Sequence, residues 1–308
     1  MCGIAGVFHK GGSEEPVGAT LLRMLGALAQ RGPDSAGVAL FGGAVPRGEI
    51  CWIKLPEDAS AGEGEAIALQ RLGTIARTIS HHRAEGLLRA VIERTAPVRE
   101  LAQRLERDGA EVVSLGRRLE LVKRVGTPAG LSELLDIEGF RGSHGIGHTR
   151  LSTESKVDLS HSQPFWARGV PDLATVHNGH ITNYDRLRRI YEQRGYRFFT
   201  QNDSEVIAVY IADSMAGGRS FEETLRASLD DLDGSFTYLA ATADEFGYAR
   251  DPFALKPLIT VETDDIVAIA NEEIAIRSVL GSTGTAHEPS GHVHKVWLRS
   301  ASRAGAAA

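Results

Sequence analysis

Apolar residues along the chain form short strand-like runs, with a few helical faces between them. Runs typical of β-strands lie at 2–9, 36–53, 111–126, 145–149, 173–177, 236–242, 246–250, 258–261 and 266–270. Apolar residues at helical spacing predict helices over about 19–30, 131–135, 184–194 and 204–215, with Asp203 at the N-cap of the last. Strands and helices do not alternate strictly, which argues against a parallel doubly wound sheet.

Residues 54–110 differ in character from the segments on either side. They are rich in Glu, Arg, Ala and Leu, and apolar residues such as Leu101 and Leu105 recur at helical spacing. Thr95 and Pro97 are helix start signals. We therefore predict a helical insertion at about 54–110, formed by an antiparallel pair of helices, within one domain spanning 2–299. The small residues of 300–308 predict a disordered tail.

Composition narrows the classes of function. The chain has 308 residues, 24% charged residues and a net charge of −6, so it has no basic footprint for nucleic acid. No apolar run approaches the roughly 18 residues of a membrane span, and no secretory signal is visible. The two cysteines, Cys2 and Cys51, exclude a disulfide framework and suit a reducing cytoplasm. No nucleotide-binding glycine motif or metal-ligand spacing is present, so we expect no metal and no cofactor in this chain.

The N-terminal sequence Met1-Cys2-Gly3-Ile4 carries candidate chemistry. Cysteine is small enough for an aminopeptidase to remove the preceding methionine. Cys2 would then carry a thiol and a free α-amine, whose unperturbed pKa values are about 8.5 and 8. A nucleophile and its general base would share one residue.

Four further segments combine turn or cap chemistry with polar groups. They are Arg31-Gly32-Pro33-Asp34, Gly147-His148-Thr149-Arg150, His177-Asn178-Gly179-His180 and Asn202-Asp203-Ser204-Glu205. Each has an ordinary structural interpretation when taken alone. Gly-Pro-Asp favours a turn, Arg150 ends a strand, Asn178-Gly179 is a strong type I′ hairpin signal, and Asp203 suits a helix N-terminus.

Together with Cys-Gly-Ile-x-Gly at the N-terminus, these segments appear in the order found in class II glutamine amidotransferases, which the chain resembles over about 2–53 and 111–280. Arg250-Asp251-Pro252-Phe253-Ala254-Leu255-Lys256-Pro257-Leu258 and Ala270-Asn271-Glu272 are similar to two further motifs of that family. The resemblance implies an α+β fold of the N-terminal-nucleophile (Ntn) hydrolase type, a four-layer αββα sandwich with two antiparallel sheets.

The resemblance also implies roles for individual residues. Cys2 matches the nucleophile, and the Asn178 side-chain amide with the Gly179 N–H matches the oxyanion hole. Arg150 matches the residue that binds the glutamine α-carboxylate, and Asp203 the residue that binds its α-ammonium. The remaining matches are a substrate contact at Thr153 and a supporting position near the nucleophile at Arg31. Leu151 and Glu154 depart from the aromatic residue and the histidine common in the family.

The implied activity is that of a glutaminase subunit, which releases ammonia and glutamate through a γ-glutamyl thioester. We expect a hetero-oligomer in which a separate synthase subunit uses the ammonia, of the glutamate synthase or N-methylglutamate synthase type. FMN and an iron-sulfur cluster would then belong to partner subunits. Two alternatives stay open, a free N-terminal-nucleophile amide hydrolase and a catalytically silent regulatory subunit.

Overall fold

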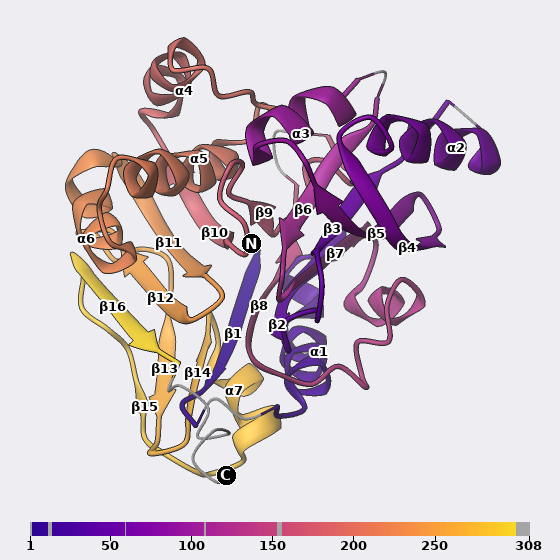
Figure 1. The fold of residues 1–308 in the computed structure, drawn as a ribbon. Helices are drawn as coiled ribbons and strands as arrows, with labels where there is room; N and C mark the ends of the chain where they lie inside the picture. The colour runs from indigo at the N-terminus through magenta and orange to yellow at the C-terminus, as the bar shows by residue number, and fades with distance from the viewer. Residues whose placement is uncertain (1, 12–13, 59, 108, 153–155, 300–308) are drawn as a thin grey trace, which may run out of the picture.

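The computed structural model describes residues 2–11, 14–58, 60–107, 109–152 and 156–299 (Figure 1). Thr153, Glu154 and the tail 300–308, for which we made predictions, lie outside the described residues. Within the described part, no helix has both the length and the apolar character that crossing a membrane requires.

A large antiparallel sheet holds the N-terminal strand in its interior. Its strands run in the order β15 (Ala286–His287), β13 (Ile259–Glu262), β14 (Ile266–Ala270), β1 (Gly3–His9), β8 (Gly142–Arg150), β2 (Ser35–Gly42) and β7 (Leu119–Val125). The register of β1 places Gly3 opposite Thr149 of β8 and Ala5 opposite Ala270 of β14. The start of the chain therefore lies beside Arg150, the last residue of β8.

A second antiparallel sheet stacks on the large one. Its order is β16 (Val293–Leu298), β12 (Glu245–Arg250), β11 (Gly234–Ala241), β10 (Ala174–Ile181) and β9 (Phe165–Trp166). The sheets approach closely at Gly6, where a Cβ would lie 2.7 Å from Phe246 and 2.9 Å from Leu239. Two residues along β1, the Phe8 ring stacks on Phe246 with centroids 5.7 Å apart. A larger residue at position 6 would push the sheets apart.

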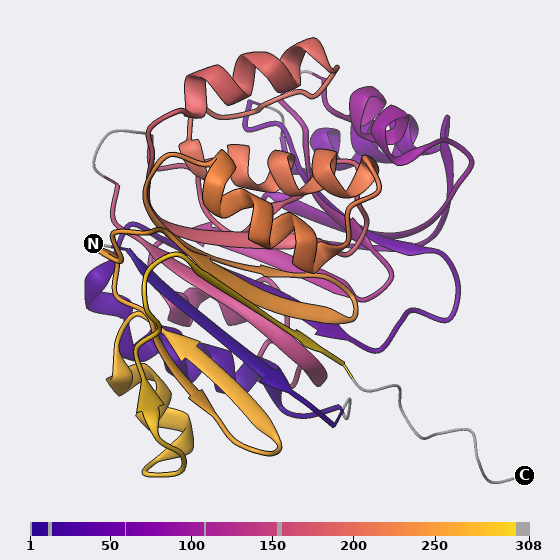
Figure 2. The same ribbon diagram turned by 90° about the vertical axis from the view of Figure 1, so that its left-hand side faces the viewer.

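Helices cover both outer faces of the stacked sheets (Figure 2). On the large sheet, α1 (Val17–Ala27) packs against β1 and β8 and contacts α7 (Glu273–Leu280). On the second sheet, α5 (Asp203–Ala216) packs against β10, α6 (Phe221–Asp231) against β12, and α4 (Tyr184–Gln193) against α5. The succession is helix, sheet, sheet, helix, and the predicted fold class is confirmed.

The segment 54–110 is not simply a pair of helices, and that prediction was wrong. The helices α2 (Ala61–Leu72) and α3 (Val98–Leu105) are present, but β4 (Ala76–Ala84) and β5 (Leu87–Arg94) form a hairpin between them. This hairpin joins β3 (Glu49–Lys54) and β6 (Glu111–Gly116) in an insertion sheet of order β4–β5–β3–β6. We use the term insertion for 54–110 and insertion sheet for these strands.

The signal for the hairpin was present in the sequence. Leu88, Ala90 and Ile92 recur every second residue and are fully buried, which is strand periodicity. Ala84 pairs with Leu87, so Glu85-Gly86 is a two-residue connection, the commonest hairpin length. Charged residues between the apolar positions, such as Arg89, imitate the composition of a surface helix.

Other elements also differ from the sequence prediction. The run 36–53 divides into β2 and β3, which belong to different sheets. The helix predicted at 131–135 is a 3₁₀ turn, η2 (Pro128–Glu133), and a second 3₁₀ turn, η1 (Ala29–Arg31), follows α1. The helices predicted from the sequence do not include α6, although Ser220 and Glu223 form a capping box at its start.

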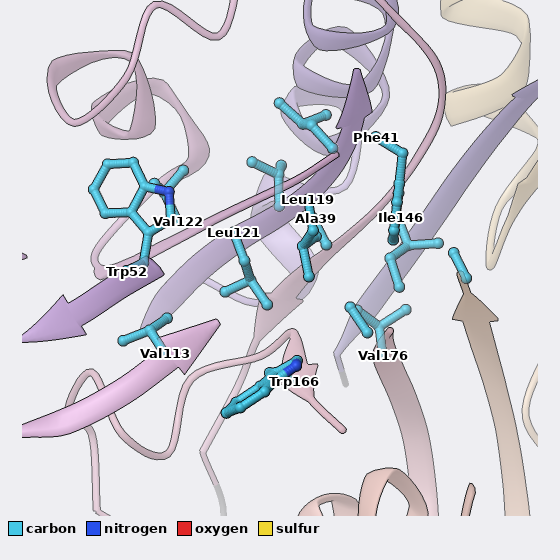
Figure 3. Packing of buried hydrophobic residues seen from close by; sticks show 14 of the residues in the cluster. Ala39, Phe41, Trp52, Val113, Leu119, Leu121, Val122, Ile146, Trp166 and Val176 are labelled. Atoms are coloured by element: carbon cyan, nitrogen blue, oxygen red, sulfur yellow. The ribbon is translucent and has the colours of Figure 1, made fainter. Parts of the chain in front are cut away.

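One hydrophobic core joins the insertion sheet to the rest of the molecule (Figure 3). Trp52 of β3 and Val113 of β6 belong to the same buried cluster as Leu121 of β7 and Trp166 of β9. Trp52 is fully buried, and its indole N–H donates to Glu120 over 2.6 Å. Because the insertion sheet shares this core, packing fixes its position against the stacked sheets.

Candidate active site

Cys2 lies at the start of β1 and is held through its backbone. Its carbonyl oxygen accepts a hydrogen bond from Arg31 Nε over 3.1 Å and another from Asn178 Nδ2 over 3.4 Å. Its Sγ donates to the Leu151 carbonyl over 3.6 Å. The Arg31 guanidinium also pairs with Glu272. The side chain of Cys2 is half-buried and free of a disulfide, so the thiol remains available for chemistry.

Asn178 and Gly179 lie inside strand β10, so the alternative of a type I′ turn is wrong. They pair with Thr237 and Phe236 of β11. The side-chain amide of Asn178 has two hydrogens, and its contact with Cys2 uses one of them. The second can be donated to an oxyanion formed next to Cys2. Gly179 has a φ of 139°, a conformation that side-chain-bearing residues rarely adopt.

Gly179→Ala is expected to destabilise the protein by about 3–5 kcal/mol, since a Cβ would lie 2.1 Å from the Ser235 carbonyl oxygen of the paired strand. Denaturant unfolding measures the loss. Gly62→Ala is the control, because a Cβ on this exposed residue of α2 meets nothing within 4 Å and should leave stability within about 1 kcal/mol of the parent. Equal stability of the two variants would contradict the close approach at Gly179.

Arg150 ends β8 as a buried cation. Its Nη1 donates to the Lys156 carbonyl over 2.8 Å, and its Nη2 lies 3.4 Å from Ser152 Oγ. Burial lowers the pKa of Arg150 from its ordinary value, yet a guanidinium stays protonated in proteins. Asp34 accepts the Ser152 N–H over 2.7 Å and so fixes the chain just after the arginine. Sequence reasoning missed this role of Asp34.

Asp203 is the first residue of α5, and the predicted N-cap position was wrong by one residue. The N-cap is Asn202, whose side chain accepts the Ser204 N–H over 3.0 Å. Asp203 Oδ2 accepts the Ile181 N–H over 2.8 Å from the end of β10. The positive end of the helix dipole favours a negative charge there. Asp203 is thus anchored beside the strand that carries Gly179.

A cavity of about 540 Å³ brings Arg150, Gly179 and Asp203 together. Its wall combines the arginine, the aspartate and the strand glycine with neighbouring loop residues: Arg150, Leu151, Ser152, Lys156, His161, Gly179, His180, Tyr184, Phe199, Thr200, Gln201, Asn202 and Asp203. A cation and an anion on the wall of one cavity suit the head group of a free amino acid. Leu151, whose carbonyl contacts the Cys2 thiol, connects this cavity with the nucleophile.

Asn271, which follows β14, fixes the side of β1 that faces away from β8. Its Oδ1 accepts the Ile4 N–H, and its Nδ2 donates to the Pro257 carbonyl over 2.9 Å. The residue is 2% exposed at the end of β14. A buried asparagine directly after an apolar strand was the available signal, since buried amides usually have hydrogen-bond partners.

Two buried histidines lie behind the site. His148 Nε2 contacts the His177 carbonyl over 3.2 Å, and that carbonyl also accepts from Gln163 Nε2 over 3.1 Å. His177 Nδ1 lies 2.8 Å from Ser204 Oγ, which connects β10 to α5. Burial lowers the pKa of His148 to about 3 and also lowers that of His177. Both imidazoles are therefore neutral near pH 7.

Stability is expected to fall as the pH drops below about 6.5, the ordinary histidine pKa. His144, buried between the sheets, has its pKa lowered by burial to about 3, as has His148. Below pH 6.5 the unfolded chain binds protons that the folded chain excludes, so each histidine costs about 1.4 kcal/mol per pH unit down to about pH 3. Denaturant unfolding at pH 7.5 and 5.5 measures this slope. His144 alone should account for about 1.4 kcal/mol of the loss between these two pH values, so His144→Gln should reduce the difference by that amount, and an unchanged difference would contradict the assignment.

Comparison with known proteins identifies the family. Residues 148–278 match the model of a glutamine amidotransferase domain. A Methanothermobacter thermautotrophicus protein with a provisional glutamine amidotransferase name is 36% identical over 291 residues, covering 92% of this chain and 95% of that protein. The glutamine amidotransferase-like protein GlxB of Rhizobium meliloti is 38% identical over 288 residues, covering 90% and 91%.

A solved structure supports the fold. Glutamine phosphoribosylpyrophosphate amidotransferase from B. subtilis, complexed with ADP and GMP, superposes with a TM-score of 0.62 at 21% identity. The match covers 96% of this chain and 47% of that one, so the chain spans about half the length of that structure. Because two relatives exceed 30% identity over nearly their full length, the chain belongs to the glutamine amidotransferases, enzymes that act on glutamine.

Proposed function

We propose that the protein is a glutaminase in which Cys2 attacks the side-chain amide of glutamine. The observation that carries this proposal is the convergence of Cys2, Asn178, Gly179, Arg150 and Asp203 around one cavity and its edge. Arg150 would bind the α-carboxylate, and Asp203 the α-ammonium. These contacts fix the amino-acid end of the substrate, so its amide end extends towards the thiol.

Maturation first removes Met1, which frees the α-amine of Cys2 before any turnover. That amine, directly or through a water, takes the thiol proton, and the sulfur bonds to the glutamine Cδ. Negative charge develops on the amide oxygen, where the second Asn178 Nδ2 hydrogen and the Gly179 N–H can stabilise it. Loss of one such donor typically costs about 2.7–4 kcal/mol of barrier.

Collapse of this intermediate breaks the bond between Cδ and nitrogen. The proton held by the amine passes to the nitrogen, and ammonia leaves. A water then attacks the γ-glutamyl thioester, giving glutamate and restoring the thiol. The overall change is glutamine plus water to glutamate plus ammonia.

We further propose that the ammonia is used by a separate synthase subunit in a hetero-oligomeric complex. The sequence resemblance favours a glutamate synthase or N-methylglutamate synthase type, whose FMN and iron-sulfur cluster would lie in the partner subunits. In such a complex, product formation from glutamine should require this chain, whereas product formation from ammonium salts should not. A complex that uses glutamine equally well without this chain would contradict the proposal.

Glutamine hydrolysis by the purified protein tests the glutaminase proposal. Ammonia and glutamate should appear in equal amounts, and intact mass should show a chain without Met1. A glutamine-analogue electrophile that labels Cys2 without turnover would indicate a competent site that needs its partner. The absence of both turnover and labelling would favour the silent-subunit alternative.

A further inference from the structure

The insertion contacts the rest of the molecule through a buried group of charges. Glu106 follows α3 directly, and Glu111 is the first residue of β6. Both carboxylates pair with Arg168, which follows β9: Glu106 contacts its Nη1, and Glu111 lies 3.2 Å from its Nη2. Glu106 and Glu111 are 3% and 4% exposed. Arg168 thus receives two carboxylates from the insertion side.

The other side of Arg168 faces the segment that precedes α5. Its guanidinium carbon lies 4.1 Å from the centroid of the Phe199 ring, and its Nε lies 3.6 Å from Glu205 Oε1. A second guanidinium, of Arg197, lies 5.2 Å from the same ring. Arg197 is itself held by the insertion, because its Nη1 donates to the Glu106 carbonyl over 3.0 Å. Phe199 therefore contacts two cations that Glu106 supports.

Glu205 extends these contacts into the wall of the glutamine cavity. One carboxylate oxygen accepts the Phe199 N–H over 3.0 Å, and the other accepts the Thr200 N–H over 2.9 Å and its hydroxyl over 2.8 Å. Phe199 and Thr200 line the cavity, as does Asp203 shortly after them. A continuous set of contacts thus runs from the insertion to Phe199 and Thr200, which share the cavity wall with Asp203.

Stability alone does not account for this arrangement. Three buried carboxylates surround one arginine, and burial raises the pKa of Glu106 to about 7, which shows how strongly its charge is disfavoured. Apolar residues of similar volume are often as stabilising as a buried ion pair, or more so. What an arginine adds is direction, since its planar guanidinium can pair with carboxylates along its edge while its face covers a ring.

We propose that Arg168 is a positioning residue for glutamine binding, through which the insertion sets the wall formed by Phe199 and Thr200. This inference rests on the proposed function for its substrate. Arg168 does not line the glutamine cavity and takes no part in bond making. Its effect therefore falls on substrate affinity, while the reaction at Cys2 is left intact.

Arg168→Met tests this role, because methionine keeps an apolar contact with Phe199 and removes the planar cation. The KM for glutamine should rise about tenfold, equivalent to about 1.4 kcal/mol of binding, with kcat changed less than about twofold. Arg168→Lys keeps the charge without the planar fork and should restore part of the affinity. Glutamine binding measured by calorimetry on a Cys2→Ala background should show the same order of affinities without turnover.

Arg94→Met is the matched control. Arg94 pairs with Glu49 in the insertion sheet and also loses a partly buried ion pair, but neither residue lines the glutamine cavity. Its KM should stay within about twofold of the parent. Equal KM values for Arg168→Met and Arg94→Met at similar thermal stability would overturn the proposal, as would a loss confined to kcat.

Hydrogen exchange gives a readout that does not depend on glutaminase activity. The Phe199 and Thr200 amides, both bonded to Glu205, should exchange faster in Arg168→Met and at the parental rate in Arg94→Met. If the parent neither binds nor hydrolyses glutamine, the proposed function fails, and this exchange still decides whether Arg168 positions the wall. Unchanged exchange at both amides would show that it does not.

Discussion

Cys2→Ala is expected to lower kcat/KM for glutamine hydrolysis by at least about 10⁴-fold, because the variant retains a binding site and loses the nucleophile. The fold should tolerate the change, since Arg31 and Asn178 contact the Cys2 carbonyl, which alanine keeps. Ammonia release under saturating glutamine is the measurement. Calorimetry should show that glutamine still binds to the variant.

Cys51→Ala is the matched thiol control. Cys51 is fully buried in β3, and burial raises the pKa of its thiol, so it stays protonated and unreactive. This variant should keep its glutaminase activity, and a glutamine-analogue electrophile should label the parent once, at Cys2. Cys2→Ala retaining more than about 1% of the parental activity would exclude Cys2 as the nucleophile.

The second large effect is expected from Arg150→Met, which should lower kcat/KM for glutamine by about 10²–10³-fold, since a bound α-carboxylate would lose its buried cationic partner. The diagnostic substrate is 4-aminobutanamide, which is glutamine without the α-carboxylate. Its slower cleavage by the parent should be nearly unaffected by Arg150→Met. Steady-state kinetics with both substrates measures the difference.

Asp203→Asn provides the reciprocal test. It should slow the cleavage of glutamine and leave the cleavage of 4-carbamoylbutanoate, which is glutamine without the α-ammonium, nearly unaffected. Asparagine can still accept the Ile181 N–H, so the local fold should persist.

Equal losses on both substrates for Arg150→Met would assign Arg150 a structural role, through its contacts with Lys156 and Ser152. Preference of the parent for a neutral acyl amide over glutamine would favour the amide hydrolase alternative.

Several features of the site follow from residue types alone. A cysteine after the initiator methionine, an arginine ending an apolar strand and an aspartate at a helix start each have the chemistry that glutamine requires. The order of these segments was sufficient to indicate the family. The resemblance also placed Arg31 near the nucleophile, and the structure brings its Nε to within 3.1 Å of the Cys2 carbonyl.

Local patterns were less reliable where one pattern fits two structures. Asn178-Gly179 is a strong turn signal, yet these residues continue β10, because β11 pairs with them throughout. The composition of 54–110 predicted helices throughout, whereas Leu88, Ala90 and Ile92 alternate as buried positions of a strand. In both cases a partner strand decides the conformation, and a local window of sequence does not contain that partner.

The sequence by itself determined the family, the candidate nucleophile and the residue types of the head-group site. Only the tertiary structure decided how they meet, because Asn178 lies 176 positions from the Cys2 carbonyl that it contacts. It also connected Glu106 of the insertion to the cavity wall through Arg168 and Phe199. Such contacts depend on strand register and on packing between distant segments, which are set by the whole core.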